Sequence, residues 1–339
     1  MDSRTVINGF EHRRSCGSCG NGDYKAQGYN KKIFKGYRGI AMKILVFDVG
    51  GTAIKYGMVD ENFDVLFSEE MPTNAFYGGN GVMKSLEMKM DEYAGQFDAI
   101  GISTAGQVDF EKGIVADGTG NIPNYKGSDL KGTFEKKYGV PVAVDNDVNC
   151  AGLGEAHFGA GVGEDNFLCL TYGTGVGGCI FWNGDVFRGT NCAAGEFGHM
   201  IVHAGGRDCT CGRKGCYEAY ASCRAFTNIV SERFDRYMSG REIFKEENLK
   251  NPVIIEELDN WENEIVNGLV SLCNIFNPSL IILGGGIMSE DLLVGHIKEK
   301  LYSRLDDNYK CVRIEKAKLR NKAGMLGAAY LANKLLKGE

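Results

Sequence analysis

The 339-residue sequence predicts an α/β protein that consists of two similar halves. Hydrophobic residues make up 43% of the chain, enough for one large or two ordinary cores. Two apolar runs, within 43–61 and 167–187, each turn back on themselves at a glycine-rich segment. An amphipathic helix and a buried strand that ends in glycines follow in the second half. Together these elements indicate a duplicated fold that binds phosphate between its halves.

The first 41 residues differ in composition from the rest of the chain. They carry a net charge of +5 within a total of −6, so residues 42–339 carry −11. Because they have many glycines and no apolar periodicity, we expect a disordered basic extension over 1–41. A lone CxxC at Cys16 and Cys19 leaves metal binding open, and the lack of a helix-turn-helix pattern disfavours nucleic acid. Met42 is an alternative start of translation.

The remaining composition points to a cytoplasmic protein with no membrane partner. No run approaches about 20 consecutive apolar residues, and no early apolar segment indicates a secretory signal. Most of the twelve cysteines stand singly in apolar surroundings, so we expect reduced core thiols and not disulfides. The sequence leaves a homodimer open.

The first hairpin, "KILVFDVGGTAIKYGMVDE" over 43–61, contains the first predicted phosphate loop. A strand follows the glycines, which excludes a Rossmann loop, and the Walker pattern GxxxxGK[ST] is absent. Gly50, Gly51 and Thr52 can bring backbone N–H groups close to an anion. Burial of the Asp48 carboxylate at the end of a buried strand costs free energy unless the carboxylate binds a cation or the water shell of a cation. The alternative is an ordinary turn with an aspartate cap.

The second hairpin, "FLCLTYGTGVGGCIFWNGDVF" over 167–187, repeats this design. Its glycines match GxGxxG formally, but the loop runs into the strand "CIFW" and not into a helix, so a dinucleotide site is excluded. We expect Gly173, Thr174 and Gly175 to contact phosphate.

The third element predicts the nucleotide end of the site. A helical stripe of apolar residues over 261–276 stops at Asn277 and Pro278, and the buried strand "LIILGGG" follows. Its glycines, Gly284 and Gly285 among them, can accept a flat adenine because no side chain obstructs it.

The segment 195–218, "GEFGHMIVHAGGRDCTCGRKGCYE", has the spacing of a metal site. Cys209, Cys211 and Cys216 form C-x-C-x4-C, which can surround one tetrahedral ion. His199 and His203 both qualify as the fourth ligand, since an extended "HMIVH" would place them on the same face. One histidine and three cysteines form a closed shell, typical of structural zinc. The alternative is a loop of free thiols.

These motifs together resemble one known family. "DVGGTAIK", "VAVDNDVN", "LTYGTGVGG", "GEFGHM", "CTCGRKGCYE" and "IILGGG" occur in this order and resemble the ROK family of sugar kinases and sugar-responsive repressors over 42–339. The resemblance implies an actin-like ATPase fold (ribonuclease H-like), with two lobes that each contain a mixed sheet and flanking helices. The expected lobes are 42–157, completed by a C-terminal helix over 322–339, and 158–321, which includes a zinc loop over 195–218.

The resemblance also implies roles for individual residues. Asp147, the second aspartate of "DNDVN", is the expected catalytic base, and its alternative role is a helix N-cap. We expect its carboxylate to be ionised at neutral pH, because the helix N-terminus favours negative charge. The implied contacts to ATP, phosphate and Mg²⁺ are Asp48, Gly50, Gly51, Thr52, Lys55, Gly173, Thr174, Gly175, Gly284 and Gly285. The implied sugar contacts are Asn146, Glu196, His199, Glu218, Gly106 and Thr119, and His199 is also the implied fourth zinc ligand.

The predicted activity is ATP-dependent phosphorylation of a hexose or hexoside, at the C6 hydroxyl, by a glucokinase-like or β-glucoside kinase-like enzyme. An N-acetylmannosamine kinase is an alternative that Gln107 disfavours, since some of those enzymes have arginine at this place. A sugar-responsive repressor is the alternative of another class. The absence of a helix-turn-helix pattern in 1–41 and the presence of Asp147 favour the kinase.

Overall fold

The computed structural model describes residues 42–118 and 120–339. The predicted basic extension over 1–41 and the predicted sugar contact Thr119 lie outside these residues. None of the helices in the described ranges is both long and apolar enough to cross a lipid bilayer.

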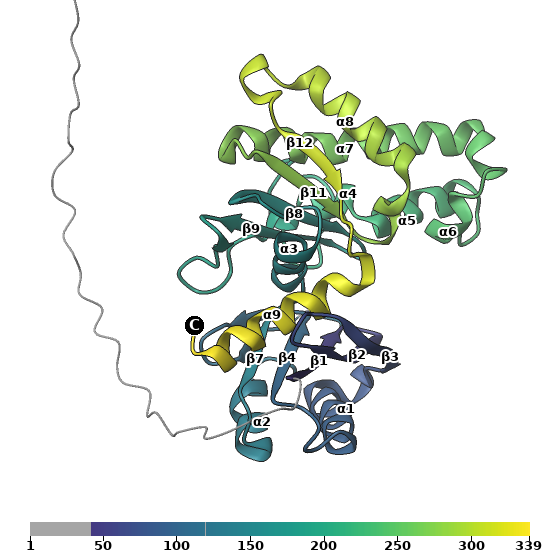
Figure 1. The fold of residues 1–339 in the computed structure, drawn as a ribbon. Helices are drawn as coiled ribbons and strands as arrows, with labels where there is room; N and C mark the ends of the chain where they lie inside the picture. The colour runs from purple at the N-terminus through teal and green to yellow at the C-terminus, as the bar shows by residue number, and fades with distance from the viewer. Residues whose placement is uncertain (1–41, 119) are drawn as a thin grey trace, which may run out of the picture. The chain divides into compact units, whose positions relative to one another are not determined.

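The first half of the chain forms a mixed five-stranded sheet (Figure 1). Its strands are β1 (Lys43–Val49), β2 (Ala53–Asp60), β3 (Val65–Pro72), β4 (Ala99–Thr104) and β7 (Val142–Asn146), in the order β3-β2-β1-β4-β7. β1 pairs antiparallel with β2 and parallel with β4. Helices α1 (Gly78–Glu92) and α2 (Leu130–Tyr138) cover one face, and α9 (Ala323–Lys337) covers the other. Alternate residues of β1 supply the two cores: Leu45 and Phe47 on the α1 side, Ile44 and Val46 on the α9 side.

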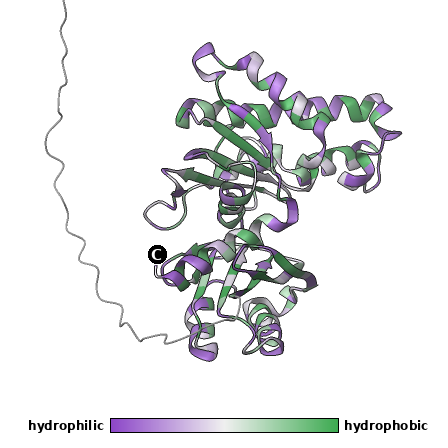
Figure 2. Ribbon diagram, in the orientation of Figure 1, coloured by the Kyte–Doolittle hydropathy of each residue, from purple (hydrophilic) through white to green (hydrophobic). Residues whose placement is uncertain are grey.

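The second half repeats the same strand order. Its sheet contains β8 (Asn166–Tyr172), β9 (Val176–Trp182), β10 (Asp185–Val186), β11 (Leu280–Gly284) and β12 (Arg313–Lys316), in the order β10-β9-β8-β11-β12. α5 (Cys223–Arg233), α7 (Pro252–Phe276) and α8 (Asp291–Arg304) form a core with one face of this sheet. Both predicted hairpins are present, as β1–β2 and β8–β9, which confirms the duplication. Figure 2 shows the apolar strands inside each half.

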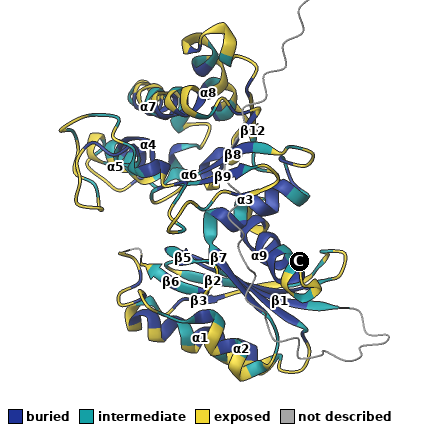
Figure 3. Cartoon of the chain, turned by 90° about the vertical axis from the view of Figure 1, so that its left-hand side faces the viewer, coloured by how far each residue is buried: buried dark blue, intermediate teal, exposed yellow. Residues whose placement is uncertain are grey.

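Two helices pack against each other between the sheets. α3 (Asp147–Phe158) and α9 are in close contact, and their apolar residues share one core with residues of both sheets. Glycines permit the approach, because a side chain at Gly327 would collide with the Cys150 carbonyl and one at Gly154 with the Ala323 carbonyl. Both helices are largely buried in Figure 3. The fold therefore brings the C-terminal helix back to the first sheet.

The shorter elements connect these layers. The predicted helix over 261–276 starts earlier, at Pro252, because the Asn251 side chain accepts a hydrogen bond from the Val253 N–H and caps it. It ends at Phe276, and the C-cap residue Asn277 has a left-handed φ of 43°. The remaining elements are strands β5 (Gln107–Asp109) and β6 (Ile114–Asp117), helices α4 (Glu218–Ala221) and α6 (Gly240–Ile243), and the 3-10 turns Ala75–Tyr77, Phe197–His199, Asn248–Lys250, Gly286–Ser289, Asp307–Tyr309 and Arg320–Lys322.

Candidate functional site

The junction between β7 and α3 places Asp147 at the first position of the helix. Asn146 is the N-cap, and its Oδ1 accepts hydrogen bonds from the Val148 and Asn149 N–H groups at 2.9 and 3.1 Å. Its Nδ2 donates to the Gly106 carbonyl at 3.0 Å and to Oδ1 of Asp147 at 2.9 Å. The N-cap alternative for Asp147 is therefore wrong, because the neighbouring asparagine caps the helix. Asn146, expected to contact sugar, uses both amide atoms within the protein.

The environment of Asp147 changes its expected charge state. Burial raises the pKa of Asp147 to about 7, and the nearby Asp48 carboxylate adds to this shift. Hydrogen bonds from the Val148 N–H and the Asn146 amide oppose it only in part. The expectation of full ionisation at neutral pH is therefore wrong. The helix N-terminus favours negative charge, but burial and a second carboxylate outweigh that effect.

Asp48 lies at the C-terminal end of β1, as predicted. Its Oδ1 accepts a hydrogen bond from the Ser103 hydroxyl at 2.7 Å, and Lys55 is its partner on β2. A side chain at Gly324, at the start of α9, would come within 2.9 Å of the same oxygen. Burial raises the pKa of Asp48, against the effects of Ser103 and Lys55. A buried carboxylate of this kind is suited to a cation or its bound water.

A cavity of about 810 Å³ extends from these two carboxylates into the second half. From the predicted site it includes Asp48, Lys55, Asp147, Gly284 and Gly285. Among the other lining residues are Glu155, Thr171, Cys223, Ser239, Gly240, Arg241, Phe244, Gly286, Ile287, Arg320 and Gly324. Its size is within the range of small-molecule sites.

The cavity is lined by the predicted glycines Gly284 and Gly285 and also by residues that the sequence did not predict. Gly285 has φ +98°, and a side chain there would collide with the Tyr172 carbonyl. Arg241 and Phe244 come from the short segment at α6, and Arg320 from the turn before α9. These segments have no recognisable spacing, so no local signal could have identified them.

The two hairpin turns follow Asp48 and Thr171, which line this cavity, in the sequence. Within the described residues, the lining of the cavity does not include the turn residues Gly50, Gly51, Thr52, Gly173, Thr174 and Gly175. The Gly50 carbonyl accepts a hydrogen bond from the Thr73 hydroxyl at 2.7 Å, and the Gly173 N–H donates to the Gly175 carbonyl at 3.0 Å. A side chain at Gly175 would collide with Oε2 of Glu218. The second turn is therefore in direct contact with a predicted sugar residue.

The other predicted sugar residues form contacts around these turns. Glu196 is exposed, and its Oε1 accepts a hydrogen bond from Nε2 of Gln107 at 3.0 Å, which connects the segment after β10 with β5. Gly106 has φ +100°. Glu218, the first residue of α4, accepts hydrogen bonds from the Cys209 thiol at 3.0 Å and the Thr210 hydroxyl at 3.3 Å.

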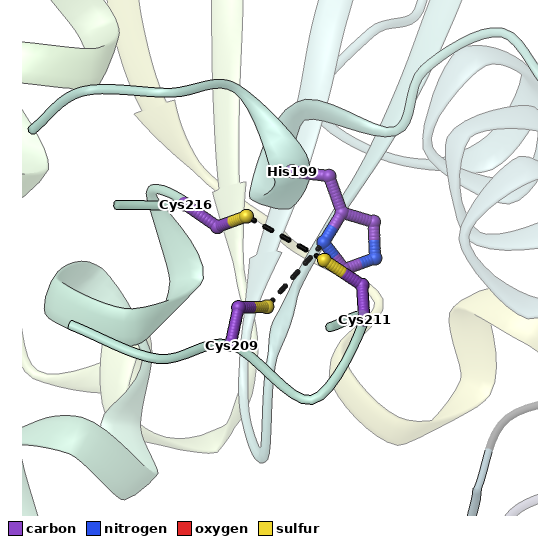
Figure 4. Close-up of side chains that lie close together, drawn as sticks. All are labelled: His199, Cys209, Cys211 and Cys216. Carbon is purple, nitrogen blue, oxygen red and sulfur yellow. Dashed lines mark hydrogen bonds between the residues drawn. The ribbon is translucent and has the colours of Figure 1, made fainter. Parts of the chain in front are cut away.

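His199, Cys209, Cys211 and Cys216 form one cluster, shown in Figure 4. Their ligand atoms all lie within 4.8 Å of one another. Nδ1 of His199 is 3.8 Å from Sγ of Cys209, and Sγ of Cys211 is 3.6 Å from Sγ of Cys216. Zinc bond lengths predict tetrahedral ligand separations of about 3.6 to 3.8 Å. The donor set therefore fits one tetrahedral ion.

His203 does not belong to this cluster. Its Nε2 is 2.8 Å from Oε2 of Glu264 on α7, and its ring lies against Tyr220 with centroids 4.3 Å apart. The segment between the histidines is not an extended strand, because Met200 and Val202 are in bends and Ile201 forms only an isolated bridge, to Cys216. His199 is thus the histidine that the fold places beside the thiols.

Comparisons with known proteins agree with this architecture. The model of the ROK family matches residues 44–335. A beta-glucoside kinase from Listeria monocytogenes is 35% identical over 298 residues, which cover 85% of this chain and 97% of that protein. A glucokinase from Streptomyces coelicolor is 33% identical over 310 residues, which cover 84% and 96%.

Solved structures give the same result. The ROK family glucokinase from Streptomyces griseus, in complex with glucose and AMPPNP, aligns with a TM-score of 0.76 and 31% identity over 87% of this chain and 99% of that chain. The ROK hexokinase from Thermus thermophilus aligns with a TM-score of 0.75 and 32% identity over 88% and 100%. The two mixed sheets with flanking helices confirm the expected actin-like ATPase fold. This chain belongs to the ROK family.

Proposed function

We propose that this protein transfers the γ-phosphoryl group of ATP to a hexose or hexoside, at the C6 hydroxyl. The observation that carries the proposal is the position of Asp147. Asn146 and not Asp147 caps helix α3, and the Asp147 side chain lines a ligand-sized cavity near Asp48. The glucokinase, hexokinase and beta-glucoside kinase relatives support the same reaction.

Asp147 would act as the general base. The hydrogen bonds to its side chain from Asn146 and Val148 both reach Oδ1, so in the described part of the chain Oδ2 is the oxygen that remains for a substrate hydroxyl. In its ionised form this oxygen would accept the proton of the attacking hydroxyl, a contribution of about 10²- to 10⁴-fold. Phosphoryl transfer is loose in character, so positioning and charge neutralisation supply most of the remaining rate.

The cavity would hold ATP. The glycine floor at Gly284 and Gly285 would accept the adenine, and the hairpin turns over 50–52 and 173–175 would contact the phosphates with backbone N–H groups. Asp48 would hold Mg²⁺ or its water shell, with Lys55 beside it. Mg²⁺ bound there would neutralise developing phosphate charge.

The thiol and imidazole cluster would hold structural zinc. Four protein ligands with sulfur and nitrogen donors leave no open position for water, which is typical of a structural site. Cys216 precedes Glu218 by two residues, so an ion held by the cluster would fix the segment that presents Glu218 to sugar. Glu196 and Gly106 would complete the sugar contacts.

A coupled assay of ADP release tests the proposal. The panel contains glucose, cellobiose, fructose, mannose, N-acetylglucosamine and N-acetylmannosamine, each with ATP and Mg²⁺. We expect ADP release with glucose or cellobiose and little with the N-acetylated sugars, because Gln107 stands where some N-acetylmannosamine kinases have arginine. Absence of sugar-dependent ADP release with every sugar would overturn the kinase assignment. Binding to operator-like DNA in that case would favour the repressor.

A further inference from the structure

A buried ion pair connects the second half of the chain to the strand that precedes Asp147. Nη2 and Nε of Arg188 donate hydrogen bonds to Oδ2 of Asp145 at 2.7 and 3.0 Å. The side chain of Asp145 is 1% exposed and that of Arg188 13%. Asp145 belongs to β7 in the first sheet, whereas Arg188 follows β10 at the edge of the second. This contact therefore crosses between the two halves.

Further contacts fix the guanidinium group in one orientation. It lies over the ring of Phe110, 3.7 Å from the centroid, between β5 and β6. Nη1 donates to the Val186 carbonyl at 3.2 Å and lies 3.9 Å from Oδ1 of Asp185. A planar guanidinium group can stack on a ring and bind a carboxylate through two N–H groups, which an ammonium group cannot do.

The other oxygen of Asp145 holds the start of α3. Its Oδ1 accepts hydrogen bonds from the Asn146 N–H at 2.7 Å and from Nδ2 of Asn149 at 3.1 Å. Asn146 in turn donates to Asp147. Because Arg188 occupies Oδ2, Oδ1 remains directed at the helix. A continuous set of hydrogen bonds thus leads from Arg188 to the proposed base.

Stability alone does not account for this pair. Burying two charges is costly, and well-packed apolar residues often replace a buried ion pair without loss of stability. The pair does determine where Asp145 directs its second oxygen. The main chain of Arg188 separately holds the segment that continues to Glu196, since the Ala194 N–H donates to the Arg188 carbonyl at 3.0 Å, and this bond does not depend on the side chain.

We propose that Arg188 is a positioning residue for phosphoryl transfer. It holds Asp145, and through Asp145 and Asn146 it sets the orientation of the Asp147 carboxylate relative to the segment that carries Glu196. The inference rests on the proposed kinase function. Misplacement of a reacting group by about 1 Å can cost about 10²-fold in rate. Loss of Arg188 should therefore lower kcat more than it weakens ground-state binding.

The test compares Arg188→Met, Arg188→Lys, Asp145→Asn and the double variant Arg188→Met/Asp145→Asn with the wild type. For each protein, kcat, KM for sugar, KM for ATP and Tm are measured. Arg313→Met is the matched control, because Arg313 also forms an ion pair, with Glu164, but at β12, and that pair is more exposed. We expect kcat to fall at least about tenfold in the Arg188→Met and Asp145→Asn variants, with KM values changed less than about threefold. The control should keep the wild-type kcat.

Two results separate positioning from a structural role. Arg188→Lys keeps the charge but not the two-pronged contact, so its kcat should lie between those of the wild type and Arg188→Met. The double variant removes both buried charges, so its Tm should recover while its kcat stays low. A folded Arg188→Met protein with kcat within about twofold of the wild type would overturn the inference, as would joint recovery of Tm and kcat in the double variant.

An unfolded variant and an inactive wild type would also give a decision. If Arg188→Met does not fold, Arg188→Lys and the double variant decide by the same criteria. If the wild type itself shows no sugar-dependent turnover, the proposed function fails, whereas an active wild type with unaffected variants rejects only the positioning role.

Discussion

The side-chain amide of Asn146 caps α3 with its oxygen and donates a hydrogen bond from its nitrogen to Oδ1 of Asp147, 2.9 Å away. Asn146 therefore initiates the helix, and the adjacent Asp147 is left for the proposed proton transfer. A change at Asp147 can consequently affect chemistry without removing the cap, and this permits sharp tests.

Asp147→Asn should lower kcat by about 10²-fold or more while KM for sugar and for ATP changes little. The amide has nearly the volume of the carboxylate and can still hydrogen-bond to a hydroxyl group, but it cannot accept the proton. Steady-state kinetics on the purified variant check this. A wild-type kcat would contradict the base assignment.

The pH dependence of kcat/KM should show an acid limb near pH 7. The pKa of Asp147 is raised to about 7, so protonation removes the base as the pH falls through that value. The profile of kcat/KM for the sugar measures this in the free enzyme. Asn146→Asp keeps a good N-cap but adds a carboxylate beside Asp147, so it should move the limb to higher pH. A limb near pH 4 in the wild type would show that Asp147 is not perturbed in this way.

At pH values above neutral, Asp147→Asn should also have a higher Tm than the wild type. A raised carboxyl pKa means that the folded state retains its proton while the unfolded chain, near pKa 3.8, has lost it. Wild-type stability from this group is therefore lost as the pH rises from about 4 to about 7. The variant has no such loss, so its Tm advantage should be greatest at pH 8 and should narrow toward pH 4.5. Equal Tm differences at both pH values would contradict this account.

Removal of the proposed zinc should weaken sugar binding. Cys211→Ser deletes one ligand of four, so metal content should fall and KM for sugar should rise as the Glu218 segment loses its support. Elemental analysis of the purified protein and sugar titration measure both effects. Cys311→Ser, an exposed thiol outside the cluster, is the control and should change neither. Fully active wild-type protein with less than about half an equivalent of zinc would refute the assignment.

Local patterns explain which features could be predicted from sequence. Each hairpin consists of two apolar runs around a glycine turn, and the cysteines that form the cluster lie within eight residues of one another. Asp147 was expected near a helix start because an apolar strand ends just before it. In each case neighbours in the sequence are also neighbours in space.

The features that were not predicted depend on contacts between distant segments. Asp48 and Asp147 are 99 positions apart, and only the first sheet, in which β4 lies between β1 and β7, brings them close enough to raise the pKa of Asp147. Arg188 and Asp145 are separated by 43 positions, and Arg188 stacks on a third segment at Phe110. No local spacing in the sequence predicts these contacts. The raised pKa of Asp147 and the Arg188–Asp145 ion pair could therefore be identified only from the structure.

The return of α9 to the first sheet has a consequence for synthesis on the ribosome. Helix α9 covers Ile44, Val46 and Ala99, yet about 160 residues separate it from the end of α3. At about 5 to 20 residues per second, that interval corresponds to roughly ten to thirty seconds of translation. During this time one apolar face of the nascent first sheet has no covering helix. Chaperones that bind nascent chains would therefore meet this face, and messages truncated before residue 323 would yield chains that expose it permanently.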